Sequence, residues 1–118
     1  MRENIIKTKS FDFAIRSVRL HKFLSERKKE FVMSKQLLRC ATCVGAMVRE
    51  AHYAESTKDF QHKLAIALKE SNESLYWLEL LNATEYISAR EFDSLHSDAT
   101  EILKILTSIL KTSKKQEP

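Results

Sequence analysis

The chain has 118 residues, the ordinary size of a single domain with one hydrophobic core. It contains one glycine and one proline, and the proline is the last residue, so the usual breakers of helices and markers of β-turns are nearly absent. Two cysteines are too few for the disulfide framework of a small secreted protein, and the net charge of +4 is modest.

The first predicted helix covers about residues 10–26 and begins at Ser10, because serine is favoured at helix N-caps. One face of this helix carries the apolar residues that we assign to the core: Phe11, Ala14, Ile15 and Val18. A second apolar set lies on the other side of the helix: Phe13, Leu20 and Leu24. The helix is therefore apolar on two faces.

A charged run from Glu26 to Glu30 has no apolar periodicity and indicates a solvated connection. The second predicted helix covers about residues 32–55, with apolar residues at spacings of three and four: Met33, Leu37, Ala41, Val44, Val48 and Ala51. Gly45 lies at the edge of this stripe. There it either lets a neighbouring helix approach closely or is simply tolerated, at a cost of about 1 kcal/mol.

The third predicted helix covers about residues 58–82 and follows a weak capping box formed by Ser56 and Asp59. Its core stripe is Phe60, Leu64, Ala67, Leu68, Ser71, Leu75, Leu78 and Leu81. A second apolar set falls on the opposite side of the helix: Ile66, Trp77 and Leu80. This is the second helix with two apolar faces.

The fourth predicted helix covers about residues 89–112 and starts at a better capping box, formed by Ser88 and Glu91. Its apolar residues are regularly spaced by three and four: Phe92, Leu95, Ala99, Ile102, Leu106 and Ile109. Residues 113–118 are expected to form a basic disordered tail. Four helices with short connections predict an all-α fold, an antiparallel up-down four-helix bundle that forms one domain over residues 1–118.

The second apolar sets of the first and third helices predict self-association. A lone bundle would leave them exposed, and exposed apolar clusters usually mark an interface whose commonest partner is another copy of the same chain. We therefore predict a homo-oligomer with these interface residues: Phe13, Leu20, Leu24, Ile66, Trp77 and Leu80.

The sequence contains no pattern typical of a catalytic, cofactor or metal site. Cys40 and Cys43 are spaced like half of a zinc site, but no second pair of ligands completes it, so we interpret both thiols as packed in or beside the core. The four histidines fall on different predicted helices, outside the Glu-x-x-His pairs of di-iron bundles. Phosphate-binding loops, dinucleotide-binding glycine motifs and nucleophile elbows are absent from the sequence. We expect no enzyme activity, no metal and no cofactor.

Charge is distributed unevenly along the chain. Residues 1–39 carry a net charge of +7, whereas residues 40–110 carry −5 and residues 111–118 carry +2. Such asymmetry serves either polyanion binding or complementary packing between subunits. The candidate nucleic-acid-binding residues are the basic residues of the first helix, of the connection and of the start of the second helix: Arg16, Arg19, Lys22, Arg27, Lys28, Lys29, Lys35 and Arg39.

Several runs in the second and third helices resemble a known family. They are Ser34–Arg39, Val44–Ala46, Lys63–Glu73 and Tyr76–Leu81. They are similar to the bacterial four-helix-bundle proteins that are encoded by intervening sequences in 23S rRNA genes and carry a ribosomal-protein label. The resemblance implies an up-down bundle, a homopentamer and no known catalytic residues. Cys43 and Met47 depart from the family pattern, which usually has a small polar residue and an asparagine there. A more distant similarity is to the accessory variability determinant of diversity-generating retroelements, a basic pentamer that binds nucleic acid and a reverse transcriptase.

Two functions follow as hypotheses. The first is a self-assembling scaffold or adaptor that presents its basic surface to RNA or DNA, with an affinity that falls steeply with salt. The second is a structural oligomer that binds a protein partner, with the basic first helix matched internally by the acidic third and fourth helices. No run approaches the roughly 18 apolar residues of a membrane span, and the N-terminus does not lead into a signal-peptide core. We expect a cytoplasmic protein with no membrane partner.

Overall fold

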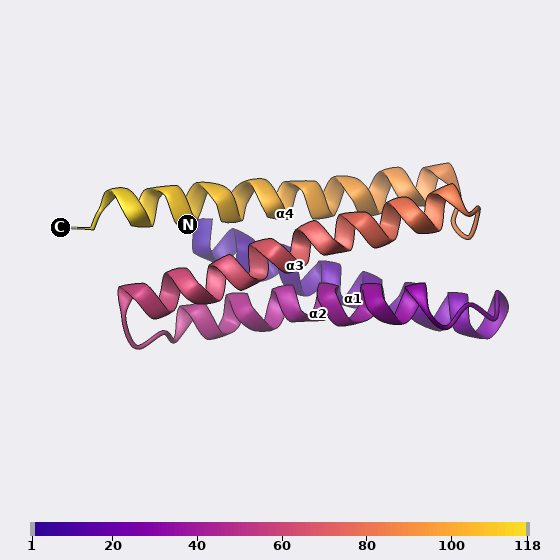
Figure 1. Ribbon diagram of the computed structural model, residues 1–118, viewed down its shortest axis with the longest axis horizontal. Coiled ribbons are helices and arrows are strands. Elements are labelled where there is room, and N and C mark those ends of the chain that lie inside the picture. Colours follow the sequence, from indigo (N-terminus) through magenta and orange to yellow (C-terminus); the bar gives the residue numbers. More distant parts are fainter. Residues whose placement is uncertain (1, 118) are drawn as a thin grey trace.

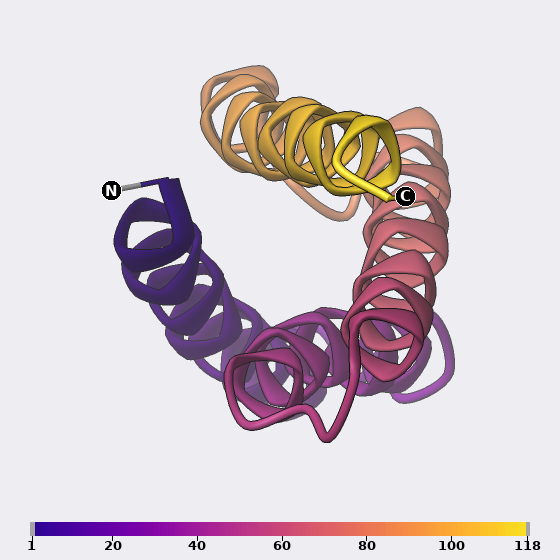
Figure 2. The same cartoon turned by 90° about the vertical axis from the view of Figure 1, so that its left-hand side faces the viewer.

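The computed structural model describes residues 2–117 and, for side chains, residues 4–117. It contains four helices, α1 (Arg2–Arg27), α2 (Met33–His52), α3 (Thr57–Ala83) and α4 (Ala89–Lys115), and no strand within the described residues. Successive helices run antiparallel along a bundle of 52 × 21 × 19 Å (Figure 1). Each helix packs against its neighbours in the sequence, and α1 also packs against α4, which closes the arrangement seen end-on in Figure 2. The prediction of an all-α, antiparallel up-down four-helix bundle is confirmed.

The first helix buries the face opposite to the one that we assigned to the core. It begins at Arg2 rather than near residue 10, and its buried residues are spaced by three and four: Ile6, Ser10, Phe13, Ser17, Leu20 and Leu24. Phe11 and Val18 are instead exposed. The assignment was wrong because serine occupies two of the six core positions, which makes the apolar pattern of the outer face look stronger than that of the inner face.

This inversion removes half of the predicted oligomer interface. The side chains of Phe13, Leu20 and Leu24 are buried in the core of their own bundle, so they are unavailable to a second copy. On α3, Ile66 and Leu80 are half-buried. Trp77 is also half-buried, because its ring packs against the core and its indole N–H donates to Glu73 Oε2 at 2.9 Å. None of the six residues forms the exposed patch that we predicted.

The core stripes of the other three helices follow the predicted spacing. The buried or core-packed residues include every apolar position that we assigned on α2 and α4, with Met33 and Phe92 half-buried at their ends. Cys40 is completely buried and Cys43 half-buried, which confirms that both thiols pack in or beside the core. None of the four helices, over the residues described, is long and apolar enough to cross a membrane.

The helix ends explain where the connections lie. Ser56 and Ser88 each accept a hydrogen bond from the backbone N–H three residues later, at 3.0 and 3.1 Å, so both predicted N-caps are confirmed. At the end of α3, Glu85 adopts a left-handed conformation (φ 65°) while Tyr86 N donates to Leu81 O at 2.9 Å, which is a Schellman termination. The tail prediction was wrong in part, because α4 continues to Lys115. Pro118 lies outside the described residues.

Small residues let α1 and α2 approach each other closely. The Cβ of an alanine at position 45 would lie 3.4 Å from the backbone oxygen of Ser10, which is ordinary van der Waals contact. Ser10 and Ser17 are both buried on α1, and their hydroxyls donate to the backbone oxygens of Lys7 and Ala14. These bonds within α1 satisfy the hydroxyls, so the serines are buried without an unpaired polar group. Gly45 thus lies at a close contact that still has room for one methyl group.

We expect the substitution Gly45→Ala to raise the free energy of unfolding by about 0.5–1 kcal/mol, because alanine removes the backbone entropy cost of glycine inside a helix. Urea denaturation would measure the change. The matched control is Ala46→Gly on the exposed side of the same helix, which should lower stability by a similar amount. A loss of stability in Gly45→Ala would contradict this account of the α1–α2 contact.

Candidate nucleic-acid interface

The turn between α1 and α2 is organised around a buried carboxylate. Glu30 is only 6% exposed. Its Oε2 accepts hydrogen bonds from the backbone N–H groups of Val32 and Met33 at 3.0 and 2.9 Å, and its Oε1 accepts one from Ser34 N–H at 2.8 Å. These are donors of the first turn of α2, which have no partner within the helix. The prediction of a solvated connection was therefore wrong at Glu30, whose side chain caps α2.

Neighbouring groups hold this cap in place. The hydroxyl of Ser34 donates to the backbone oxygen of Glu30 at 3.1 Å, and it lies 3.1 Å from His21 Nδ1 on α1. Lys29 adopts a left-handed conformation (φ 55°), which turns the chain so that Glu30 N–H donates to Leu24 O at 3.0 Å. The turn is thus bonded to the last turns of α1 as well as to the first turn of α2.

The same contacts set the acidity of Glu30. Burial alone would raise its pKa, but the hydrogen bonds from Ser34, Met33 and Val32 favour the charged carboxylate and outweigh burial, so the pKa lies below its ordinary value of 4.5. A carboxyl group whose pKa is lowered by folding stabilises the folded state above its unfolded-state pKa. This contribution is lost as the pH falls through the lower pKa of the folded state.

We expect Glu30→Gln to lower the free energy of unfolding at pH 7 by about 1 kcal/mol, because an amide replaces a charged cap with three backbone donors. The difference between the wild type and this variant should shrink as the pH falls below 4.5, where the carboxyl group of the unfolded chain becomes protonated, and vanish below the lower pKa of the folded state. Urea denaturation across this pH range measures both effects. Glu26→Gln, a change at an exposed glutamate just before the turn, should have little effect, and equal losses in the two variants would refute the cap.

Five of the eight predicted basic residues gather around this turn. Their side chains are exposed, and within residues 2–117 none of them makes an ion pair: Lys22, Arg27, Lys28, Lys29 and Lys35. We call these five residues the basic turn. Two glutamates lie among them: the charge of Glu30 is directed inward to backbone N–H groups, whereas Glu26 is exposed. The basic turn therefore presents a concentrated positive charge at one end of the bundle.

Two other predicted residues, unlike the basic turn, have acidic partners on neighbouring helices. Arg16 pairs with Asp98 of α4 at 2.7 Å. Arg39 pairs with Glu70 and Glu73 of α3 at 3.2 and 2.5 Å. Their place in the candidate interface stays a prediction, and sequence alone does not reveal which cations face an acidic helix. The eighth residue, Arg19, is exposed but lies farther along α1.

Exposed apolar side chains accompany the basic turn, and the sequence interpretation missed them. Phe31 and Val32 are 56% and 71% exposed, and Phe23 on α1 is 43% exposed. Lys28 Nζ lies 6.0 Å from the centre of the Phe23 ring. The available signal was that Phe31 directly follows the charged run, ahead of the periodic stripe that begins at Met33.

One cluster of potential metal ligands occurs among the described residues. The thiol of Cys40 and the carboxylates of Glu70 and Glu73 lie within 4.8 Å of one another. Both carboxylates already bind Arg39, and Glu73 also accepts the Trp77 indole N–H. Burial raises the pKa of the Cys40 thiol to about 11, so the thiolate that would bind a metal is disfavoured at neutral pH. The cluster is thus an internally paired network of α2 and α3.

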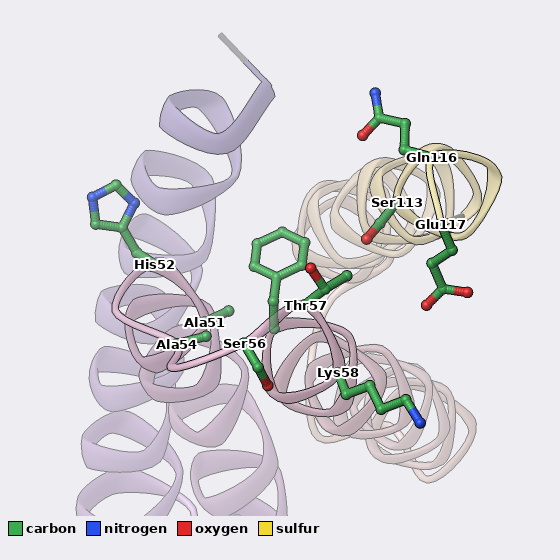
Figure 3. A pocket seen from close by; sticks show the side chains of 10 residues that line it. Ala51, His52, Ala54, Ser56, Thr57, Lys58, Ser113, Gln116 and Glu117 are labelled. Atoms are coloured by element: carbon green, nitrogen blue, oxygen red, sulfur yellow. The ribbon is translucent and has the colours of Figure 1, made fainter.

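A hollow of about 820 Å³ lies at the opposite end of the bundle, between the α2–α3 turn and the end of α4 (Figure 3). Alanine, serine and threonine side chains line much of it. His52 and Glu117 lie on opposite sides of the hollow in Figure 3, so they do not converge as an acid–base pair. The hollow has room for a ligand, but His52 and Glu117 do not come together in it as a catalytic pair.

The fold and its surface define the class of the protein: a small all-α four-helix bundle with five exposed cations around one turn. The model of the 23S rRNA-intervening sequence protein family matches residues 2–108, and the chain belongs to this family. Among solved structures, the chain is similar to a protein of unknown function from the S23 ribosomal protein family of Bacteroides thetaiotaomicron VPI-5482. The two chains are 56% identical with a TM-score of 0.93, over 94% of this chain and 99% of the other. No match is found among curated proteins. These similarities indicate no enzymatic family or fold.

Proposed function

We propose that this protein is a non-enzymatic, cytoplasmic homo-oligomer that acts as a scaffold and binds RNA or DNA through the basic turn. The supporting observation is that five exposed cations cluster around one turn, whereas two cations farther back on α1 have acidic partners. On α1, Lys9 and Arg16 form ion pairs with Glu101 and Asp98 of α4, at 2.8 and 2.7 Å. The five cations of the basic turn have no acidic partner within the described chain. Clustered cations of this kind suit the phosphates of a nucleic acid.

The same separation disfavours the alternative function, a structural oligomer in which acidic helices match the basic first helix. That matching occurs between α1 and α4, but it engages residues in the middle and first half of α1. It leaves the turn at the end of α1 uncompensated. Internal charge matching thus accounts for the paired set and not for the basic turn.

We expect charge reversal of Arg27, Lys28 and Lys29 to glutamate to lower nucleic-acid affinity by about 100-fold or more. It should also make the plot of log affinity against log salt concentration less steep, by a slope of about two to three. Each lost phosphate contact lowers the number of released counterions by roughly one. Fluorescence anisotropy with labelled oligonucleotides at two salt concentrations measures both quantities.

The matched control reverses Lys111, Lys114 and Lys115, which are exposed near the opposite end of the bundle. It changes the net charge by the same amount and should retain most of the affinity. Undiminished binding by the variant at the basic turn would refute the proposed surface.

Self-association is supported by the outer face of α1, in place of the residues first predicted. Phe11 is 55% exposed and Val18 is 37% exposed. Phe11 and Ala14 line a groove of about 400 Å³ between α1 and α2, together with Gly45 and Ala46. An apolar strip beside a shallow groove suits contact with another protein surface. We propose that a second copy covers this strip. The proposed number of chains in the oligomer, five, is taken only from the family resemblance.

We expect the double substitution Phe11→Asp and Val18→Asp to lower the molar mass in solution to that of one chain, 13.7 kDa. Both side chains are exposed, so the bundle itself should remain folded. Light scattering gives the mass and circular dichroism reports the helices. Trp77→Glu should mainly lower stability, because Trp77 packs against the core. A wild-type protein with the mass of one chain would end the proposal of self-association.

A further inference from the structure

The exposed aromatic rings beside the basic turn lie outside the hydrophobic core. Phe31 is 56% exposed and lies outside both helices, and Phe23 is 43% exposed on α1. Phosphates need only the cations, so the basic turn as a polyanion site leaves these rings unexplained. Water contact with two large rings is unfavourable and is relieved when a flat apolar surface covers them.

The backbone that carries Phe31 is held firmly. Glu30, immediately before it, is buried and bonded to backbone N–H groups, and Val32, immediately after it, donates to the Glu30 carboxylate at 3.0 Å. The next turn of α2 begins at once, because Gln36 N–H donates to Val32 O at 3.2 Å. A ring on an anchored backbone loses little further freedom when it binds a partner.

A cation and an aromatic ring also lie near each other on this surface. Lys28 Nζ lies 6.0 Å from the Phe23 ring centre, and Lys29 and Phe31 flank Glu30 in the same turn. A nucleotide of a single strand offers a phosphate and an unstacked base face at this scale. Proteins that bind single strands combine basic grooves with aromatic platforms for this reason. We infer that the basic turn binds single-stranded nucleic acid, with bases stacked on Phe31 and Phe23. This inference rests on the proposed function.

Acidic residues at the same end of the bundle favour a narrow ligand. The α1–α2 and α3–α4 turns lie at the same end (Figure 1). The second of these turns exposes Glu85, and the first turns of α4 expose Asp93 and Arg90, so the two carboxylates outnumber the one cation. A duplex or an anionic membrane is broad enough to cover both turns and would meet these carboxylates, whereas a single strand can follow the basic turn alone. The bases of a duplex are also stacked on each other, so they offer no face to the rings.

The test compares a labelled 20-nucleotide oligo(dT) with a duplex of equal length by fluorescence anisotropy, using the full chain. We expect the wild type to bind the single strand at least tenfold more tightly. Phe31→Leu keeps an apolar side chain but loses the stacking face, and it should weaken single-strand binding about tenfold. Phe31→Trp should retain binding, and Tyr53→Ala, a change at an exposed aromatic residue at the opposite end, should have no effect.

The outcomes separate the inference from the proposed function. Equal affinity for single strand and duplex, or unchanged binding by Phe31→Leu, overturns the inference. In that case, a loss of binding on charge reversal of the basic turn would still support a polyanion site. Binding to vesicles of phosphatidylcholine and phosphatidylserine in preference to the oligonucleotide also overturns the inference. If the wild type binds neither the single strand nor the duplex, the proposed function fails and the inference fails with it.

Discussion

The hydrogen bonds of the Glu30 carboxylate are the constraint on which the rest of this structure depends most directly. They supply partners for three backbone donors at the start of α2, where Val32, at the N-cap position, gives no side-chain hydrogen bond. The connection between α1 and α2 is only five residues long, so this cap also fixes how the two helices meet. Ser34 extends the network to His21 of α1. A charge buried for structural reasons therefore determines the conformation of the most basic segment of the chain.

This arrangement explains how an acidic residue can lie inside a basic surface without cancelling it. The carboxylate of Glu30 is directed inward, while the flanking Lys29 and Phe31 side chains remain in solvent. Elsewhere the bundle uses opposite charges between neighbouring helices, as in Arg16 with Asp98 and Lys63 with Glu50. Such exposed pairs contribute little to stability, on the order of 0–1 kcal/mol each, but they remove cations from the binding surface. Stability rests mainly on the buried core, and the proposed binding would rest on charges that the fold leaves unpaired.

Much of the fold could be predicted because three helices carry a regular apolar pattern. On α4 the predicted apolar residues recur every three or four positions, and five of them are buried: Leu95, Ala99, Ile102, Leu106 and Ile109. On α1 the same reasoning selected the wrong face. Ser10 and Ser17 are core residues there, since their hydroxyls bond to the backbone of their own helix, and α2 comes close to α1 at Ser10. Apolar periodicity does not identify a buried serine as a core residue. The wrong choice of face on α1 therefore also placed core residues in the predicted oligomer interface.

The candidate site was predicted in part for a different reason. Charge composition located the basic turn, because like charges that adjoin in the sequence remain adjacent in a short connection. It could not reveal that Arg39 pairs with Glu70 and Glu73, which are about thirty residues away in the chain. It also could not find the cap, since Glu30 differs from the exposed Glu26 only through its three-dimensional surroundings. Long-range pairing and local capping are decided by packing, and the sequence pattern contains neither.

The central claim is that a firmly held basic turn is the surface that binds a nucleic acid. Hydrogen exchange measured by mass spectrometry, with and without a single-stranded oligonucleotide, tests this claim most directly. We predict that the amides of Val32, Met33 and Ser34 exchange slowly in the free protein, since the Glu30 carboxylate binds them. We also predict that added oligonucleotide protects residues 22–35 and leaves the α3–α4 turn unchanged. Rapid exchange of these amides in the free protein, or protection that appears only elsewhere on the bundle, would contradict the account.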